Sequence, residues 1–385
     1  MSREPIMAAG REGAAIEGAR EPARGRRFPR VQLAVGSLGF VGLTVAVFWY
    51  QFARVPGDAP ALAWSSLRWP YLALLLLCLP VESVASALRI WLLCRVLEPR
   101  VGLWTCFKAE WANVAIAMLT PSQSGGGPGQ IYMLSRGGAR VGTALTVSLL
   151  SFLGTMIGLF VMGLYSLLVS GIGATAPLFA GAVWTLTVIA AFMAVAACWP
   201  DPIRVALAAA SRALWRMGPR RRALREWWPP DTAPTARPVD RMGPLTARLV
   251  DLVYAYRDDV ARFLRLGTAH FVGVCLLSLV FLFARALMPY LCLRFLGLET
   301  AGLRHVLDLQ IALVFLVFFA PTPGGAGLAE AASLSVMADV VPAAVAPYYT
   351  LLWRSMTLYL AAIAGLVCLL QALLADARRA LAPRR

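Results

Sequence analysis

The chain has 385 residues, of which 59% are hydrophobic and only 15% are charged, and its mean hydropathy is +0.69. This composition lies outside the range of soluble domains and indicates an integral membrane protein. The length accommodates roughly six to eight membrane-spanning helices of about 20 residues and leaves no room for a sizeable soluble catalytic domain. A transmembrane β-barrel is excluded as well, because the apolar runs are continuous and do not alternate with a period of two.

The positive charge predicts the orientation in the membrane. The formal net charge of +16 comes almost entirely from arginine, since Lys108 is the only lysine. The arginines cluster in an N-terminal tail (1–30), a central loop (200–265) and a C-terminal tail (375–385). Because cytoplasmic segments carry an excess of basic residues, we expect a multi-pass protein of the cell (inner) membrane with both termini in the cytoplasm. Nucleic-acid binding is disfavoured, since no basic stripe interleaves with exposed aromatic residues.

Six apolar segments within a transmembrane domain at 31–374 predict full membrane spans. They lie at residues 31–53, 69–97, 144–170, 177–199, 268–296 and 346–374. Their direction alternates consistently with the arginine clusters. The second half of the basic loop has apolar residues at helical spacing, which predicts an amphipathic helix on the membrane surface.

Two further semi-apolar stretches, 101–119 and 306–320, do not fit this count, and each ends in a break rich in glycine and proline. The breaks are PSQSGGGPGQ at 121–130 and PTPGGAGLAE at 321–330. Backbone freed from a helix at membrane depth is tolerated only where protein or water satisfies its polar groups. The predicted fold is therefore an all-α integral membrane protein with six transmembrane helices and two re-entrant hairpins, each lining a cavity.

The two breaks align with each other at an offset of 200 residues. The alignment pairs Pro121 with Pro321, Gly125 with Gly325, Gly127 with Gly327, Gln130 with Glu330 and, upstream, Lys108 with Asp308 and Glu110 with Gln310. The spans that precede the two breaks run in opposite directions, so residues 69–170 and 268–374 are predicted to form an inverted repeat. Transporters built in this way bind their substrate between the repeats. Chance similarity of two glycine-rich loops is the alternative, but it does not explain the matching topology.

Three arginines, Arg89, Arg285 and Arg354, lie inside predicted spans. An arginine in mid-bilayer costs at least about 2.5 to 3.5 kcal/mol, so each should face a partner, water or a ligand. We expect Arg285 and Arg354 to lie level with the second break and its Glu330. Snorkelling or structural pairing is the alternative, and Glu82, which shares a helix face with Arg89, is a candidate for such a pair.

No pattern in the sequence indicates an enzyme. There is no phosphate-binding GxxxxGK[ST] motif, the two histidines are isolated, and the seven cysteines show no CxxC spacing, so we predict no catalytic residue, no cofactor and no metal site. An enzymatic alternative would make Glu330 a general base, but no activated nucleophile accompanies it. Helix N-termini in the breaks, near Gly129 and Leu328, instead suit phosphate oxygens.

Four motifs carry a resemblance to a known family: RIW at 89–91, PSQSGGGPGQIYMLSRGG at 121–138, PTPGGAGLAEA at 321–331 and WR at 353–354. Together they resemble the flippase-like transmembrane domain of lysylphosphatidylglycerol synthases, over roughly 69–374. The resemblance implies movement of aminoacylated or other anionic-derived lipids between leaflets, while a separate soluble domain, which nothing here matches, attaches the amino acid. Gln130 stands where many members have a carboxylate, which disfavours a cationic aminoacyl headgroup.

The sequence thus predicts a lipid flippase or transporter whose partners are membrane lipids. A phospholipid or polyprenyl-phosphate headgroup would pass through a polar cavity between the two hairpins, with arginines on the phosphate, Lys108 and the glutamates as gates, and glycines that allow close backbone approach. The candidate pathway residues are Arg89, Lys108, Glu110, Gly125, Gly126, Gly127, Gln130, Arg285, Asp308, Gln310, Pro321, Gly324, Gly325, Gly327, Glu330 and Arg354. The rival hypothesis is a noncatalytic membrane partner or regulator of a lipid-modifying or glycosyl-transferring enzyme, which docks through the basic loop.

Overall fold

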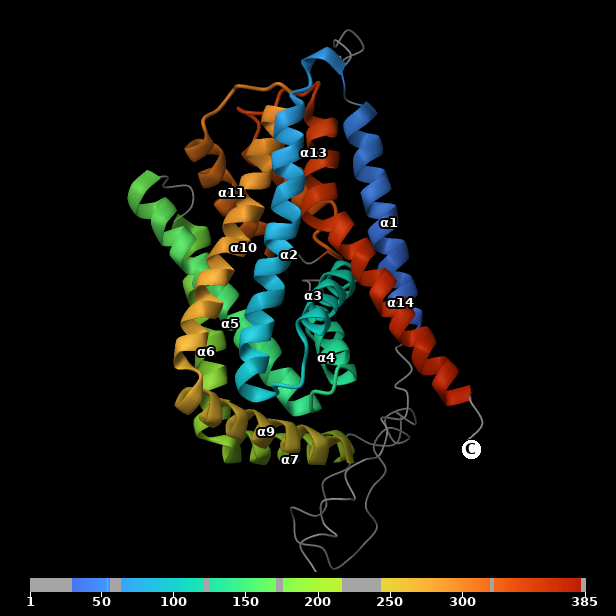
Figure 1. Ribbon diagram of the computed structural model, residues 1–385, viewed down its shortest axis with the longest axis vertical. Helices are drawn as coiled ribbons and strands as arrows, with labels where there is room; N and C mark the ends of the chain where they lie inside the picture. Colours follow the sequence, from blue (N-terminus) through green and yellow to red (C-terminus); the bar gives the residue numbers. More distant parts are fainter. Residues whose placement is uncertain are drawn as a thin grey trace, which may run out of the picture.

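The computed structural model describes residues 30–53, 55, 64–120, 125–170, 176–216, 244–318 and 322–381, and every regular element in these ranges is a helix (Figure 1). In chain order the helices are α1 (Arg30–Ala53), the 3₁₀ helix η2 (Trp64–Ser66), α2 (Trp69–Leu97), α3 (Leu103–Met118), α4 (Gly126–Arg136), α5 (Val141–Tyr165), the π-helix η3 (Ser166–Ser170), α6 (Ala176–Cys198), α7 (Pro200–Arg216), α9 (Pro244–Leu266), α10 (Thr268–Phe295), α11 (Leu303–Phe318), α12 (Leu328–Val336), α13 (Ala346–Arg354), the π-helix η5 (Ser355–Tyr359) and α14 (Leu360–Leu381). The predicted all-α class is confirmed for this part of the chain.

Several helices are long and apolar enough to cross a membrane. By length and hydropathy four qualify, namely α2, α5 with the start of η3, α10, and the continuous run from α13 through η5 into α14. A fifth is added if the end of α6 and the start of α7, bent by 95° at Trp199, count as one span. The protein is therefore a multi-pass membrane protein. Helices α1 and α6 stand where the other two spans are expected, and the count of six stays a prediction.

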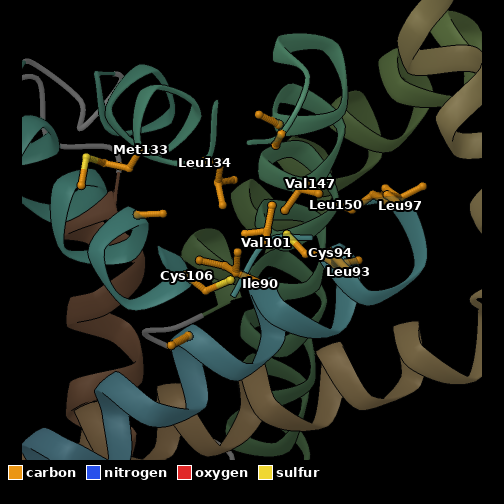
Figure 2. Packing of buried hydrophobic residues seen from close by; sticks show 14 of the residues in the cluster. Ile90, Leu93, Cys94, Leu97, Val101, Cys106, Met133, Leu134, Val147 and Leu150 are labelled. Carbon is orange, nitrogen blue, oxygen red and sulfur yellow. The ribbon is translucent and has the colours of Figure 1, made fainter. Parts of the chain in front are cut away.

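Helices α2 and α10 form the centre of the bundle. They pack side by side and run in opposite directions, as the sequence predicted for the spans that precede the two breaks (Figure 1). Two apolar clusters surround opposite halves of this pair. One gathers Ile90 and Leu93 of α2 with α3, α4 and α5 (Figure 2), and the other gathers Leu75 with Met288 of α10 and Tyr349 of α13. Since lipid is as apolar as these side chains, close van der Waals packing rather than hydrophobic burial holds such helices together.

Each half of the bundle contains a helical hairpin. Helix α3 is followed by the short helix α4, which folds back along it, and α11 is followed in the same way by α12 (Figure 1). Helices α3 and α11 both have 16 residues, and their bounds differ by the 200 residues that separate the two breaks. The order of elements in the first half thus recurs in the second.

The glycines of the two breaks serve different purposes. In the first, a Cβ atom on Gly126 would lie 1.9 Å from the side-chain oxygen of Asn113, and one on Gly129 would lie 2.8 Å from the carbonyl oxygen of Ala112, so glycine lets α4 approach α3. In the second, Gly324 and Gly327 have φ angles of +58° and +81°, which side chains with a Cβ rarely adopt. Glycine is therefore needed for close packing in one hairpin and for a left-handed turn in the other.

Helices α7 and α9 lie across the lower end of the bundle, as drawn in Figure 1. Helix α9 buries Val250, Tyr256 and Phe263 against it, which confirms the amphipathic helix predicted in the second half of the basic loop. Helix α7 is a second amphipathic helix that the sequence analysis did not predict. The proline-rich middle of the loop and most of both basic tails lie outside the described residues.

The crossing of α14 over α3 depends on Gly365. A Cβ atom at this position would lie 1.8 Å from the carbonyl oxygen of Trp111, and backbone cannot move aside as a flexible side chain can. We expect Gly365→Ala to destabilise the protein by about 1–3 kcal/mol, the usual cost of overpacking, and to lower the midpoint of thermal unfolding in detergent. The matched control is Gly42→Ala on α1, where a Cβ atom would meet nothing within 4 Å. Equal midpoints for the two variants would contradict the crossing.

Candidate functional site

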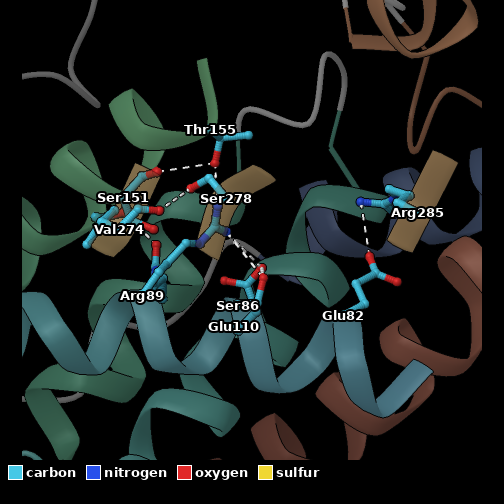
Figure 3. A network of polar contacts seen from close by, with 11 residues as sticks. Glu82, Ser86, Arg89, Glu110, Ser151, Thr155, Val274, Ser278 and Arg285 are labelled. Atoms are coloured by element: carbon cyan, nitrogen blue, oxygen red, sulfur yellow. Dashed lines mark hydrogen bonds and ion pairs between the residues drawn. The ribbon is translucent and has the colours of Figure 1, made fainter. Parts of the chain in front are cut away.

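The first buried ion pair joins α2 to α3 and α5. Arg89 of α2 is 5% exposed, and its guanidinium lies 3.4 Å from Oε1 of Glu110 on α3 (Figure 3). The hydroxyl of Ser86 donates to the same oxygen at 3.1 Å, and Arg89 also donates to the hydroxyl of Thr155 on α5. Arg89 therefore ties the first hairpin to the centre of the bundle.

The second pair joins α2 to α10. Glu82 lies 3.6 Å from Nη1 of Arg285, whose Nη2 donates to the carbonyl oxygen of Thr357 (Figure 3). Thr357 belongs to the π-helix η5, and such single π-turns in α-helical runs are frequent at functional sites. The side chain of Arg285 is 30% exposed, which makes it the most accessible of the three arginines.

The third pair closes the second hairpin. Arg354, the last residue of α13, places Nε 2.8 Å from Oε1 of Glu330, near the start of α12. The other carboxylate oxygen of Glu330 accepts a 2.7 Å hydrogen bond from the N–H of Gly327, and Arg354 donates to the carbonyl oxygen of Gly324 at 2.9 Å. Glu330 is fully buried, so this carboxylate simultaneously caps α12 and holds the left-handed turn against α13.

The three pairs are neighbours of one another. The ring of Phe281 on α10 lies between the first two, since its centroid is 4.9 Å from the guanidinium carbon of Arg89 and 5.7 Å from that of Arg285. Thr357, which Arg285 contacts, follows Arg354 by three residues on the same helical run. We call this set the arginine–glutamate chain; its members are Glu110, Arg89, Glu82, Arg285, Arg354 and Glu330. It connects the first hairpin, through α2 and α10, with the second.

The chain is electrically balanced. Three arginines face three glutamates, and in apolar surroundings an unpaired charge of either sign would be costly. The pairing differs in part from what the sequence suggested. Arg354 lies beside Glu330 as expected, whereas Arg285 contacts Glu82, and Arg89 pairs with Glu110 rather than with Glu82.

Gln130 and Glu330, which the repeat aligns, have different surroundings. Gln130 lies on α4 and is 2% exposed, and its side-chain oxygen accepts a 2.7 Å hydrogen bond from the hydroxyl of Ser148 on α5. Glu330 faces an arginine. The neutral residue therefore has a neutral partner and the acid has a cation, which explains the difference between the two breaks in physical terms.

The remaining candidate residues surround the chain without an ion pair to it among the described contacts. Lys108 is half-buried on α3, while Asp308 and Gln310 are buried on α11, where Gln310 lies 3.5 Å from the hydroxyl of Tyr349. Gly125 donates its N–H to the hydroxyl of Thr120. Gly127 and Gly325 lie in the breaks beside the glycines already described, and Pro321 is outside the described residues. Helix α12 begins at Leu328 as expected, but α4 begins at Gly126, before Gly129.

The sequence analysis missed the neutral groups that complete the chain. These are Ser86, Thr155, Phe281 and Thr357. Two of them carried a signal, because Ser86 lies three residues before Arg89 and Phe281 four before Arg285, the spacings at which helical side chains meet. Thr155 and Thr357 carried none, since their contacts depend on the packing of separate helices.

The chain is closely packed in this conformation. The cavity beside Arg285 measures about 10 Å³ and is lined mainly by Leu159, Met162, Leu282 and Ile311. A cavity needs about 10–15 Å³ to hold one water molecule. A larger ligand therefore requires the helices around Arg285 to separate.

Fold and site together define an all-helical, multi-pass membrane protein with paired charges inside its apolar bundle. The family described as lysylphosphatidylglycerol synthase TM region matches residues 32–365, and the chain belongs to this family. The match contains both hairpins and the whole arginine–glutamate chain, and it confirms the resemblance seen in the sequence. No match was found among curated proteins or among solved structures.

The buried pair of the second hairpin should dominate local stability. In Arg354→Gln, the carboxylate of Glu330 would stay buried without its cation, which costs about 3–5 kcal/mol. The matched control is Asp376→Asn, which breaks the pair with Arg136 at a site where the Asp376 side chain is 41% exposed; there we expect about 1 kcal/mol or less. Thermal unfolding in detergent measures both.

A double variant tests the cause of that loss. Adding Glu330→Gln to Arg354→Gln removes the stranded charge, so stability should recover in part. If the double variant is as unstable as the sum of the two single variants, the pair is not the origin of the effect.

Proposed function

We propose that the protein is a membrane lipid flippase or transporter that moves the phosphate-bearing headgroup of a phospholipid or polyprenyl-phosphate lipid between leaflets. The family assignment supports a lipid-related role in the membrane. The observation that carries the proposal is the arginine–glutamate chain, because it places phosphate-binding side chains in succession across an otherwise apolar bundle, from one hairpin to the other.

In the proposed topology α1, α2, α5, α6, α10 and the α13–α14 run span the inner membrane, and both termini are cytoplasmic. The two hairpins, α3–α4 and α11–α12, are re-entrant and belong to an inverted repeat. The length of α3 and α11 supports this, because 16 residues extend about 24 Å at about 1.5 Å per residue, less than the roughly 30 Å of the hydrocarbon core. Each hairpin would enter and leave from the same side.

The proposed mechanism is an exchange of partners. A guanidinium binds phosphate and carboxylate with the same planar geometry, so a headgroup phosphate can replace a glutamate on each arginine in turn. When the headgroup moves on, the glutamate returns, and no arginine is left unpaired in the apolar interior. The paired and closely packed conformation is then the resting state, and the acyl chains stay in lipid throughout.

The proposal assigns no catalytic residue and no cofactor. Glu330 was the candidate for a general base, but Arg354 engages one of its carboxylate oxygens and the N–H of Gly327 the other. A carboxylate held in this way is stabilised as an anion and is a weak base. The geometry therefore favours a structural and gating role for Glu330.

Transport is tested in liposomes that contain fluorescent phosphatidylglycerol or fluorescent phosphatidylcholine, with an impermeant quencher added outside. The full-length protein should make the inner-leaflet pool accessible faster than empty vesicles do. Arg285→Gln should slow this by about tenfold or more, since a lost charge-assisted hydrogen bond costs about 1.5–3 kcal/mol. The matched control is Arg294→Gln on the same helix, whose partner Glu299 is 59% exposed.

Two outcomes would contradict the proposal. Rates equal to those of empty vesicles for every headgroup would remove the transport function. Normal transport by Arg285→Gln, with a folded protein, would place the pathway elsewhere in the bundle.

The second candidate function, a noncatalytic partner of a lipid-modifying or glycosyl-transferring enzyme, is favoured by the basic loop and by the two amphipathic helices at the lower end of the bundle. Deleting residues 229–243, which lie outside the described part of the chain, separates the two functions. Intrinsic transport should persist at the full-length rate in the same liposome assay. Loss of transport together with loss of an enzyme partner in pull-downs would favour the docking function.

A further inference from the structure

A second charged site lies at the lower end of the bundle, where α2 ends, α5 begins and α9 crosses beneath them (Figure 1). It is a pocket of about 440 Å³, lined by residues 97–100, by Gly138 and Arg140 between α4 and α5, and by Arg262 of α9. It shares no lining residue with the arginine–glutamate chain.

The pocket has a surplus of positive charge that its own acids do not neutralise. Arg140 lies 3.8 Å from Glu98 and 3.6 Å from Asp259, and its side chain is 70% exposed. Arg262 makes only a 3.5 Å contact with a backbone carbonyl oxygen. Within the described ranges Arg100 has no ion-pair partner. Three arginines therefore line a space in which they are loosely held and accessible, whereas those of the chain are inside the bundle.

The start of α5 adds to this field. Its N-cap residue, Arg140, has extended backbone and no side-chain cap from any described residue. The first N–H groups of a helix have no partner within the helix, and the helix dipole makes this end partially positive. A phosphate in the pocket would meet arginine side chains beside a helix end that favours anions.

Apolar side chains stand exposed next to each arginine. Trp104 follows Arg100 by four residues, Val141 follows Arg140 directly, and Leu264 follows Arg262 by two; they are 61%, 54% and 66% exposed. Basic residues beside exposed tryptophan and aliphatic side chains are typical of the membrane–water interface. A soluble phosphate compound would leave these side chains in water, whereas the chains of a lipid would cover them.

We propose that this pocket binds the headgroup phosphate of an anionic phospholipid, with the acyl chains on the exposed apolar side chains around it. The site is separate from the proposed transport path and does not depend on transport. Its position, at the end of the helix that carries Arg89, would keep an anionic lipid bound to the lower end of the bundle.

Binding is measured by native mass spectrometry of the full-length protein, titrated in detergent with dioleoyl phosphatidylglycerol, dioleoyl phosphatidylcholine or the soluble headgroup analogue glycerol 3-phosphate. We expect the wild-type protein to prefer phosphatidylglycerol. The double variant Arg100→Gln with Arg262→Gln should weaken its binding by about tenfold or more, since each basic residue near an anionic lipid contributes about 1 kcal/mol. This variant leaves Arg140 with Asp259, so that no buried acid loses its cation.

The matched control is Arg257→Gln with Arg265→Gln, two exposed arginines of α9 that do not line the pocket and whose loss removes the same charge. Its phosphatidylglycerol binding should equal that of the wild type. Equal weakening in both double variants would overturn the proposal in favour of nonspecific attraction. Wild-type binding of glycerol 3-phosphate as tight as that of phosphatidylglycerol would overturn the lipid assignment, and equal binding of phosphatidylcholine would overturn the role of charge.

Discussion

The structure depends on one constraint, that a charge inside an apolar bundle must be paired. Arg89, Glu110, Glu330 and Arg354 are all less than 9% exposed, and in such surroundings an uncompensated ion costs several kcal/mol. Each pair joins separate helices, so satisfying the charges also fixes how the helices lie. The hairpins are held to the central helices α2 and α10 by these pairs as much as by packing, because apolar contact alone distinguishes poorly between a neighbouring helix and lipid.

How far the sequence predicts this arrangement differs between elements. Hydropathy located the central helices to within a residue or two, and insertion cost singled out the three arginines, because both depend on local composition. The partners were less accessible. Glu82 and Arg89 share a face of α2, yet each turns to another helix, and only the positions of α3 and α10 decide this. Helix α7 and the π-turn at Thr357 were missed for the same reason, since neither has a signature in composition.

The two halves of the bundle solve the same problem with different residues. In the first hairpin the acid stands on the longer helix, as Glu110, and the short helix carries the neutral Gln130. In the second the positions are reversed, with the neutral Gln310 on the longer helix and Glu330 on the short one. Each half thus keeps one acid for one arginine. An inverted repeat that places its acids at non-equivalent positions presents a different surface at each end, and a lipid would meet different groups on entering and on leaving.

The chain and the lower pocket hold arginine in two electrostatic states that suit successive steps of lipid recognition. In the pocket, the loosely paired and exposed guanidinium groups of Arg100 and Arg140 can attract an anion without first breaking a strong contact. Within the chain, a phosphate must displace a carboxylate, and the gain on one contact is set against the loss of the other. Such an exchange has a small net free energy at each step, as continuous movement requires, because a site that bound phosphate far more tightly than carboxylate would retain it. Paired arginines are therefore better suited to passage, and unpaired ones to capture.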